Sequence, residues 1–192
     1  MIKVGDIGFL RALETSDLDW LYSIENNAEW WHLGISKEPW SKDVLSKYID
    51  SQPGNLMRDG QLRLILEVEG SPLGALDIYD YDPIARKGGL GIVMNQEAQG
   101  KGLAKMAMGS FVQYLLQTIG LNMVYAVTPI TNEASIALFE SLHLKIPAPY
   151  AVGFYKKVNF KMLTSFNLFR HEKDHHNYCR GYYSRWINIP SL

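Results

Sequence analysis

Apolar and polar positions alternate along several short segments of the chain. In "QLRLILEVEG", 61–70, Leu62, Leu64 and Leu66 share one face, and branched residues are frequent, which is typical of a strand. "SP" then turns the chain into a partner strand, "LGALDIYD". Three further apolar segments also predict strands: "GFLRAL" (8–13), "LGIVMN" (90–95) and "NMVYAVTP" (122–129).

Four segments with apolar residues at helical spacing predict helices: 15–31, 42–52, 103–120 and 131–143. We expect Ser16 to cap the first helix, with Asp19 completing a capping box. Thr131 or Asn132 is the expected cap of the last helix. The segment "PGNLMRDG", between the second helix and the first hairpin, has the composition of a loop.

The order of these elements predicts the fold class. A strand, two helices, three strands, a helix, a strand and a helix do not alternate as in a doubly wound sheet. We therefore predict an α/β (α+β) fold with a mixed central sheet flanked by helices. The chain has 192 residues, which suits one domain with a sizeable core.

Composition narrows the class of function. The formal net charge of −1 argues against binding nucleic acid by bulk electrostatics. A single cysteine, Cys179, allows no internal disulfide and fits a reducing compartment. No signal peptide is apparent at the start, and no apolar run approaches the ~20 residues of a membrane span. We therefore expect a cytoplasmic protein without membrane or nucleic-acid partners.

The segment "NQEAQGKGLAK", 95–105, contains the first candidate chemistry. Gly100-Lys101 is followed by Gly102 rather than by Ser or Thr, which excludes a P-loop. The third glycine of a dinucleotide fingerprint is also missing, because Lys105 stands in its place. A strand, a glycine turn and a helix start remain. This arrangement either binds an anion through free N–H groups or is only a turn, and composition favours neither.

The same loop resembles the signature of the GNAT superfamily of N-acetyltransferases. Its pattern, Q/R-x-x-G-x-G/A, is matched by Gln99, Gly102 and Ala104, and Asn132 matches the asparagine of a second motif. The segments "LRALETSDLDWLYSIENNAEWW", "EPW" and "LGALDI" are similar to the branch of spermidine and ribosomal-protein alanine acetyltransferases. The resemblance implies a single GNAT-type domain over residues 1–143, with a mostly antiparallel sheet whose fourth and fifth strands splay apart.

The resemblance also implies where acetyl-CoA binds. Backbone N–H groups of the glycine loop would hold its pyrophosphate, and Asn132 would face the pantetheine arm. The acetyl arm would lie between the splayed strands, where a backbone N–H would act as an oxyanion hole. The implied cofactor-binding residues are Ile92, Val93, Met94, Gln99, Gly100, Lys101, Gly102, Leu103, Ala104, Lys105 and Asn132.

Acidic and aromatic residues mark the expected acceptor side. Asp77 aligns with an acidic residue of the polyamine branch and would bind the cationic amine or relay its proton, although an exposed strand aspartate fits the pattern equally well. The expected acceptor-binding residues are Glu25, Glu29, Trp31, Glu38 and Asp82, whose charges and indole ring suit a cation. Taken singly, each of these acids also fits a solvated surface, and the tryptophan fits a core.

Two features depart from the family pattern. Many relatives carry a tyrosine that protonates the leaving thiolate, but Phe139 stands here, so we assign no general acid. Residues 144–192 form an atypical tail where the family continues with a hairpin. A codon choice for "IPAPYAVGFYKK" read from its third base gives TGTLRGWILQK, which is similar to that hairpin. We hypothesise that a one-base frameshift produced the tail.

The tail also contains a set of residues with metal-ligand spacing: His171, His175, His176 and Cys179. Under the frameshift hypothesis this spacing is accidental, and we expect no metal site. The resemblance implies an acetyl-CoA-dependent N-acetyltransferase that acetylates the primary amine of a small cationic acceptor, such as a polyamine or diamine, by direct attack in a ternary complex. A protein N-terminus as acceptor and an impaired acyl-CoA sensor remain as alternatives. A homodimer is expected from the resemblance alone.

Overall fold

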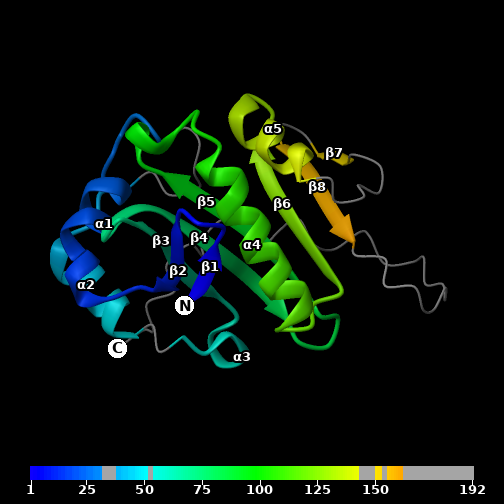
Figure 1. Cartoon of the computed structure of the whole chain (residues 1–192), viewed down its shortest axis with the longest axis horizontal. Coiled ribbons are helices and arrows are strands. Elements are labelled where there is room, and N and C mark those ends of the chain that lie inside the picture. Colours follow the sequence, from blue (N-terminus) through cyan, green and yellow to red (C-terminus); the bar gives the residue numbers. More distant parts are fainter. Residues whose placement is uncertain (32–37, 52–53, 143–149, 153–154, 162–192) are drawn as a thin grey trace.

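The computed structural model describes residues 1–31, 38–51, 54–142, 150–152 and 155–161. Within them, one eight-stranded sheet has the order β1-β2-β3-β4-β5-β6-β8-β7 (Figure 1). All neighbours pair antiparallel except β5 and β6, which are parallel. The strands are β1 Ile2–Val4, β2 Gly8–Ala12, β3 Leu62–Val68, β4 Ser71–Asp82, β5 Lys87–Met94, β6 Met123–Pro129, β7 Tyr150–Val152 and β8 Tyr155–Lys161.

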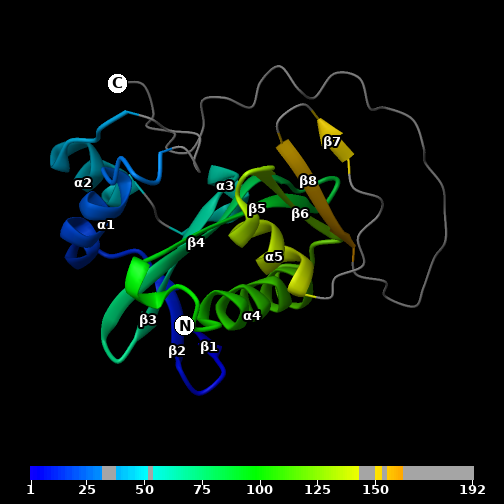
Figure 2. The ribbon, with the colours of Figure 1, turned by 90° about the horizontal axis from the view of Figure 1, so that it is seen from above.

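Helices cover both faces of the sheet. The α-helices are α1 Leu18–Glu25, α2 Lys42–Ser51, α3 Leu56–Asp59, α4 Leu103–Gln117 and α5 Glu133–Ser141, with short 3-10 helices η1 Thr15–Asp17 and η2 Gln96–Ala98. Figure 2 shows α4 and α5 on one side of the strands and the pair α1 and α2 on the other. The fold is therefore the mixed α/β arrangement that the element order predicts, and its sheet is mostly antiparallel, as the resemblance implies.

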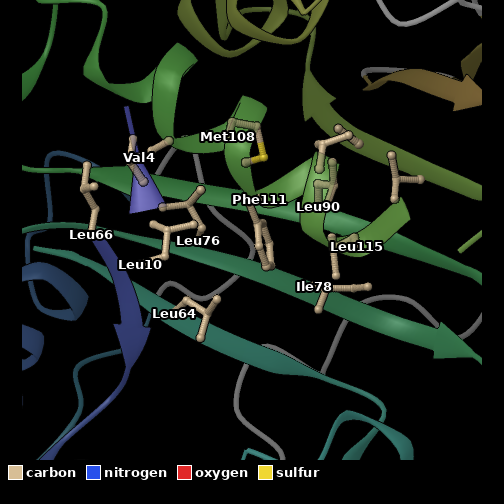
Figure 3. Packing of buried hydrophobic residues seen from close by; sticks show 14 of the residues in the cluster. Val4, Leu10, Leu64, Leu66, Leu76, Ile78, Leu90, Met108, Phe111 and Leu115 are labelled. Carbon is tan, nitrogen blue, oxygen red and sulfur yellow. The ribbon is translucent and has the colours of Figure 1, made fainter. Parts of the chain in front are cut away.

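The alternation of the central strands supplies a core to each face. Even-numbered residues of β3 and β4 pack with α4, and Figure 3 shows Met108, Phe111 and Leu115 of this helix facing Leu76 and Ile78. Odd-numbered residues of the same strands face α1 and α2, where they form a second, smaller core whose buried members are Leu13, Leu21, Leu45, Tyr48, Ile49, Ile65 and Ala75. Each helix layer is thereby fixed to the sheet by its own apolar cluster.

The predicted strands and helices are confirmed, with local corrections. The helix predicted over 15–31 is shorter, because α1 ends at Glu25. The capping box is formed by Glu14 and Asp17 around η1 rather than by Ser16 and Asp19, because a 3-10 turn precedes α1. The predicted loop 53–60 contains the one-turn helix α3. The sequence reading also missed β1, which is only three residues long. Of the two expected caps of α5, Thr131 and Asn132, the structure has Asn132, whose side-chain oxygen accepts from the Ser135 N–H at 3.1 Å.

The predicted splay between two central strands is confirmed. Parallel pairing of β5 with β6 runs from Lys87↔Met123 to Leu90↔Ala126 and then stops. Beyond that point β5 continues to Met94 beside β4 on its other edge, and β6 continues to Pro129 beside β8 on its other edge. The strands β7 and β8 come from the tail, yet they complete the sheet beside β6. The frameshift hypothesis for residues 144–192 stays a prediction.

Candidate active site

The gap between β5 and β6 is the first part of the candidate site. From Gly91 to Met94, the main chain of β5 pairs only with β4 among the described strands. Ile92 and Val93 are half-buried and Met94 is 7% exposed, so their side chains pack while the backbone edge toward β6 has no strand partner. An extended ligand arm can therefore bind along this edge as an additional strand would.

The glycine loop begins where this gap ends. Gly100 has φ of 71° and Gly102 has φ of 76°, a left-handed conformation that glycine adopts at little cost. The Gln99 side chain donates from Nε2 to the carbonyl oxygen of Met94 at 3.2 Å, which ties the loop to the end of β5. Gly102 is the N-cap of α4, so the loop directs the chain from the gap into the start of the helix.

A run of backbone N–H groups in this loop has no acceptor in the described part of the chain. Met106 is the first residue of α4 whose N–H has a backbone partner, the carbonyl of Gly102 at 3.2 Å. None of the N–H groups from Gly100 to Lys105 donates to another described residue. The loop lies at the surface, and no chain atom comes within 4 Å of a Cβ built on either glycine. Converging N–H groups at the start of a long helix form a site for an anion.

Asn132 lies on the other side of the gap, at the start of α5 after β6. Its backbone N–H donates to the carbonyl of Pro129 at 2.9 Å, and its side-chain oxygen caps the helix. Its amide nitrogen donates to no other described residue, so it remains available for a ligand. One side chain can therefore cap the helix and donate toward the gap.

Arg63 joins two of the predicted acidic residues, Glu25 and Asp77, on the face covered by α1 and α2. Its Nε and Nη2 donate to the two oxygens of Asp77 at 2.7 and 3.1 Å, and its Nη1 donates to Oε1 of Glu25 at 2.7 Å. The guanidinium also lies 5.7 Å from the ring centre of Tyr48. Asp77 pairs with Gly91 across β4 and β5, which places the cluster beside the beginning of the gap.

Burial gives this cluster unusual protonation properties. Burial alone would lower the pKa of the Arg63 guanidinium, but the charges of Asp77 and Glu25 raise it well above its usual value. Burial also raises the pKa of Tyr48 to about 12, so the phenol stays neutral. A cavity of about 10 Å³ beside Arg63 and Asp77 has room for about one water molecule. This cavity is too small for an acceptor chain.

The remaining predicted acceptor residues are not gathered with this cluster. Glu29 and Glu38 are exposed. Trp31 donates from its indole to the carbonyl of Glu25 at 3.1 Å, which keeps its ring near the end of α1. Asp82 accepts the N–H groups of Ile84 and Ala85 at 2.9 and 2.8 Å, in the turn at the far end of β4 from the glycine loop. Their part in acceptor binding stays a prediction.

Arg63 was not predicted as part of the site, although a charged residue on a buried strand face indicates a buried partner. It shares one strand face with Ile65, and this face is buried under α1 and α2. A charged residue at such a position needs a buried partner, and Asp77 is the partner that strand pairing supplies. Phe139 is 3% exposed and packs in the core cluster that contains the buried face of α4.

Comparison with known proteins decides the family. A model of the acetyltransferase (GNAT) domain matches residues 9–145, which is more than half of the chain. The chain belongs to the GNAT acetyltransferase family. It is an N-acetyltransferase that uses acetyl-CoA, and the splayed strands and the glycine loop are the features of its fold that suit this co-substrate.

Individual relatives agree with this assignment. The spermidine N(1)-acetyltransferase of Escherichia coli is 23% identical over 171 residues, which cover 85% of this chain and 86% of that protein. The enzyme of that name from Vibrio cholerae is 24% identical over 132 residues, 68% of this chain and 75% of that protein.

Solved structures show the same fold. The Vibrio cholerae spermidine N-acetyltransferase in complex with CoA and spermine has a TM-score of 0.69 at 21% identity, covering 84% of this chain and 98% of that chain. The ribosomal alpha-N-protein acetyltransferase RimL in complex with coenzyme A also has a TM-score of 0.69, at 18% identity, with 83% and 95% covered.

Other predictions concern membrane and metal binding. None of the described helices combines the length and hydropathy that a membrane span requires. Within the described ranges, no three His, Cys, Asp or Glu side chains gather in a way that would hold a metal ion. The histidines and Cys179 of the tail lie outside the described residues, so the expectation about them stays a prediction.

Proposed function

We propose that the protein transfers the acetyl group of acetyl-CoA to the primary amine of a small cationic acceptor of the polyamine or diamine class. The observation that carries the proposal is the combination of the β5–β6 gap with the unpartnered N–H groups from Gly100 to Lys105. The gap suits the thioester arm of acetyl-CoA, and the loop suits its pyrophosphate.

The glycine loop is the proposed pyrophosphate site. Its N–H groups donate to the phosphate oxygens, and the positive end of α4 adds about 0.3–1 kcal/mol. Gln99 fixes the start of the loop, while Lys101 and Lys105, both exposed, contribute charge at its rim. Leu103 and Ala104 are half-buried and anchor the helix, so in this site their backbone acts rather than their side chains.

The β5 edge is the proposed site of the thioester arm. Main-chain groups of Ile92, Val93 and Met94 pair with the arm, and an N–H from this edge donates to the thioester oxygen. The amide nitrogen of Asn132 donates to the arm from the opposite side. Acetyl-CoA supplies an activated acyl group with a good leaving group, and the chain positions it and excludes water.

The acceptor amine has to reach the gap in its neutral form. A lysine-like amine with a pKa of about 10.4 loses about 4.6 kcal/mol to deprotonation at pH 7. Both oxygens of Asp77 accept from Arg63, so Asp77 acts in this proposal through the charge of the cluster rather than as a free base. Glu25 is the more exposed carboxylate, with 19% of its side chain accessible against 10% for Asp77. Glu25 is the proposed contact for the cation.

Similarity to the spermidine acetyltransferases supports a polyamine as the acceptor. The pairing of Asp77 with Arg63 favours a second candidate, the single α-amine of a protein N-terminus, because it removes one of the acids that a polycation would use. A homodimer and a cytoplasmic location stay expectations.

A thiol-release assay tests the proposal. Acetyl-CoA is mixed with the protein and with spermidine, putrescine, an aminoglycoside or a peptide with a free N-terminus. The proposal expects the fastest CoA release with the polyamine or the diamine. Release with the peptide alone would replace it by the second candidate. Binding of acetyl-CoA without turnover of any acceptor would indicate an acyl-CoA sensor and refute the proposal.

A further inference from the structure

Arg63 contacts two carboxylates on different elements, and it does so beside the unpaired edge of β5. Its side chain is 5% exposed and lies between Asp77 of β4 and Glu25 at the last position of α1. The ring of Tyr48, from α2, covers the guanidinium. The Arg63 guanidinium is therefore fixed in position by contacts from a strand, a helix end and an aromatic ring.

The contacts of Arg63 divide unequally between the two acids. Asp77 uses both oxygens on Arg63, whereas Glu25 uses Oε1 only, so Oε2 of Glu25 accepts from no described residue. Two carboxylates and one guanidinium leave the cluster a single negative charge, and that charge is accessible at Glu25. The carbonyl end of α1 adds partial negative charge at the same place.

The cluster lies close to the reacting end of the candidate site. Asp77 is the cross-strand partner of Gly91, which immediately precedes Ile92 on the unpaired edge of β5. The pair partner has no side chain, so no bulky group of β5 separates the cluster from the gap. A change in the charge of the cluster therefore changes the electrostatic potential where an acceptor amine would arrive.

We infer that Arg63 is a specificity-determining residue, a built-in counter-cation that limits the Arg63–Asp77–Glu25 cluster to one net negative charge and so to one ammonium group held at Glu25. The inference rests on the proposed function. Arg63 acts through Asp77 and Glu25: it neutralises the first and leaves the second to the acceptor. Without this guanidinium, the two acids would attract a di- or polyamine much more strongly than a monoamine.

Calorimetry on the CoA-loaded protein tests the inference, with spermidine and n-butylamine as probes. The measured quantity is the ratio of their dissociation constants, which does not require turnover. Arg63→Gln leaves the cluster with two negative charges, and we expect the preference for spermidine over butylamine to rise about tenfold, as for one partly screened charge. Arg63→Lys keeps the cation and should keep the wild-type ratio.

A double variant separates charge from folding. Removing one partner of a buried ion pair destabilises a protein strongly, whereas replacing both by apolar residues of similar size is often neutral. Arg63→Met with Asp77→Leu keeps the single charge on Glu25, so its ratio should equal that of the wild type. Glu25→Gln removes that charge, and both amines should then bind more weakly.

Two results would overturn the inference. One is an unchanged ratio in Arg63→Gln while CoA still binds with wild-type affinity. If Arg63→Gln does not fold, the decisive result is a shifted ratio in the double variant, because its net charge is unaltered. Turnover in the thiol-release assay separately tests the proposed function. A wild type that is inactive in this assay but shows the predicted ratios of dissociation constants would refute the proposed reaction while supporting the role of Arg63.

Discussion

A carboxylate at Gly102 should abolish CoA binding. Gly102 is the N-cap of α4, with φ of 76° and open space around its missing Cβ, so the new side chain would enter the region that the free N–H groups face. At about 5 Å and an effective dielectric constant of about 20, each negative charge of a pyrophosphate would cost about 3 kcal/mol. We therefore expect the dissociation constant of CoA to rise more than a hundredfold in Gly102→Asp, measured by isothermal titration calorimetry.

Gly70 provides a matched control for backbone strain. It also has φ of 76° and no atom within 4 Å of a built Cβ, but it lies in the turn between β3 and β4. Gly70→Asp and Gly102→Asp should therefore lose similar stability, about 1–2 kcal/mol, while only the second loses CoA. Gly102→Ala should bind CoA far better than Gly102→Asp. Wild-type CoA affinity in Gly102→Asp would refute our placement of the pyrophosphate.

Three further predictions concern the support of the site. Asn132→Asp keeps the cap on α5 but loses the amide donor, so the KM for acetyl-CoA should rise without a drop in melting temperature, whereas Asn132→Ala should also lose about 1 kcal/mol of stability; equal melting temperatures for the two variants would contradict the capping role. Phe111 is fully buried on the sheet-facing side of α4, and Phe111→Ala should lower the free energy of unfolding in urea by about 3–5 kcal/mol. Burial opposes ionisation of Asp17, but hydrogen bonds from Arg11 and from the backbone hold its pKa below the usual value. The contribution of the Asp17 carboxylate to folding stability is therefore present above about pH 4 and is lost as the pH falls through the folded pKa. Urea titrations should show that Asp17→Asn destabilises the protein at pH 7 but much less near pH 2.

Local pattern was sufficient to predict most of the fold. Alternating apolar and polar residues predict β3 and β4, and apolar residues at helical spacing after a glycine turn predict α4. Two elements that escaped prediction are short: β1 has three residues and pairs with β2, and α3 is a single turn capped by Asn55. The true capping box at Glu14 and Asp17 was missed because Ser16 matches the usual signature better than a glutamate does.

The candidate site was predictable only in its backbone part. Gly100 and Gly102 predict a turn that leaves backbone N–H groups free, because such a turn requires glycine at fixed positions. The charge cluster depends on strand register and helix docking, which bring Asp77 and Glu25, 14 and 38 residues away in sequence, to Arg63. The local sequence around each residue does not predict these contacts, so the sequence alone does not show that Asp77 pairs with Arg63.

Transfer of a labelled acetyl group tests the central claim most directly. The protein is incubated with acetyl-CoA carrying a carbon-13 acetyl group and with spermidine, and the products are followed by NMR and mass spectrometry. The account predicts that the label moves to a primary amine of spermidine, and that Gly102→Asp prevents the transfer while Gly70→Asp does not. Label that stays on CoA in the wild type, or that leaves only as free acetate, would contradict the account.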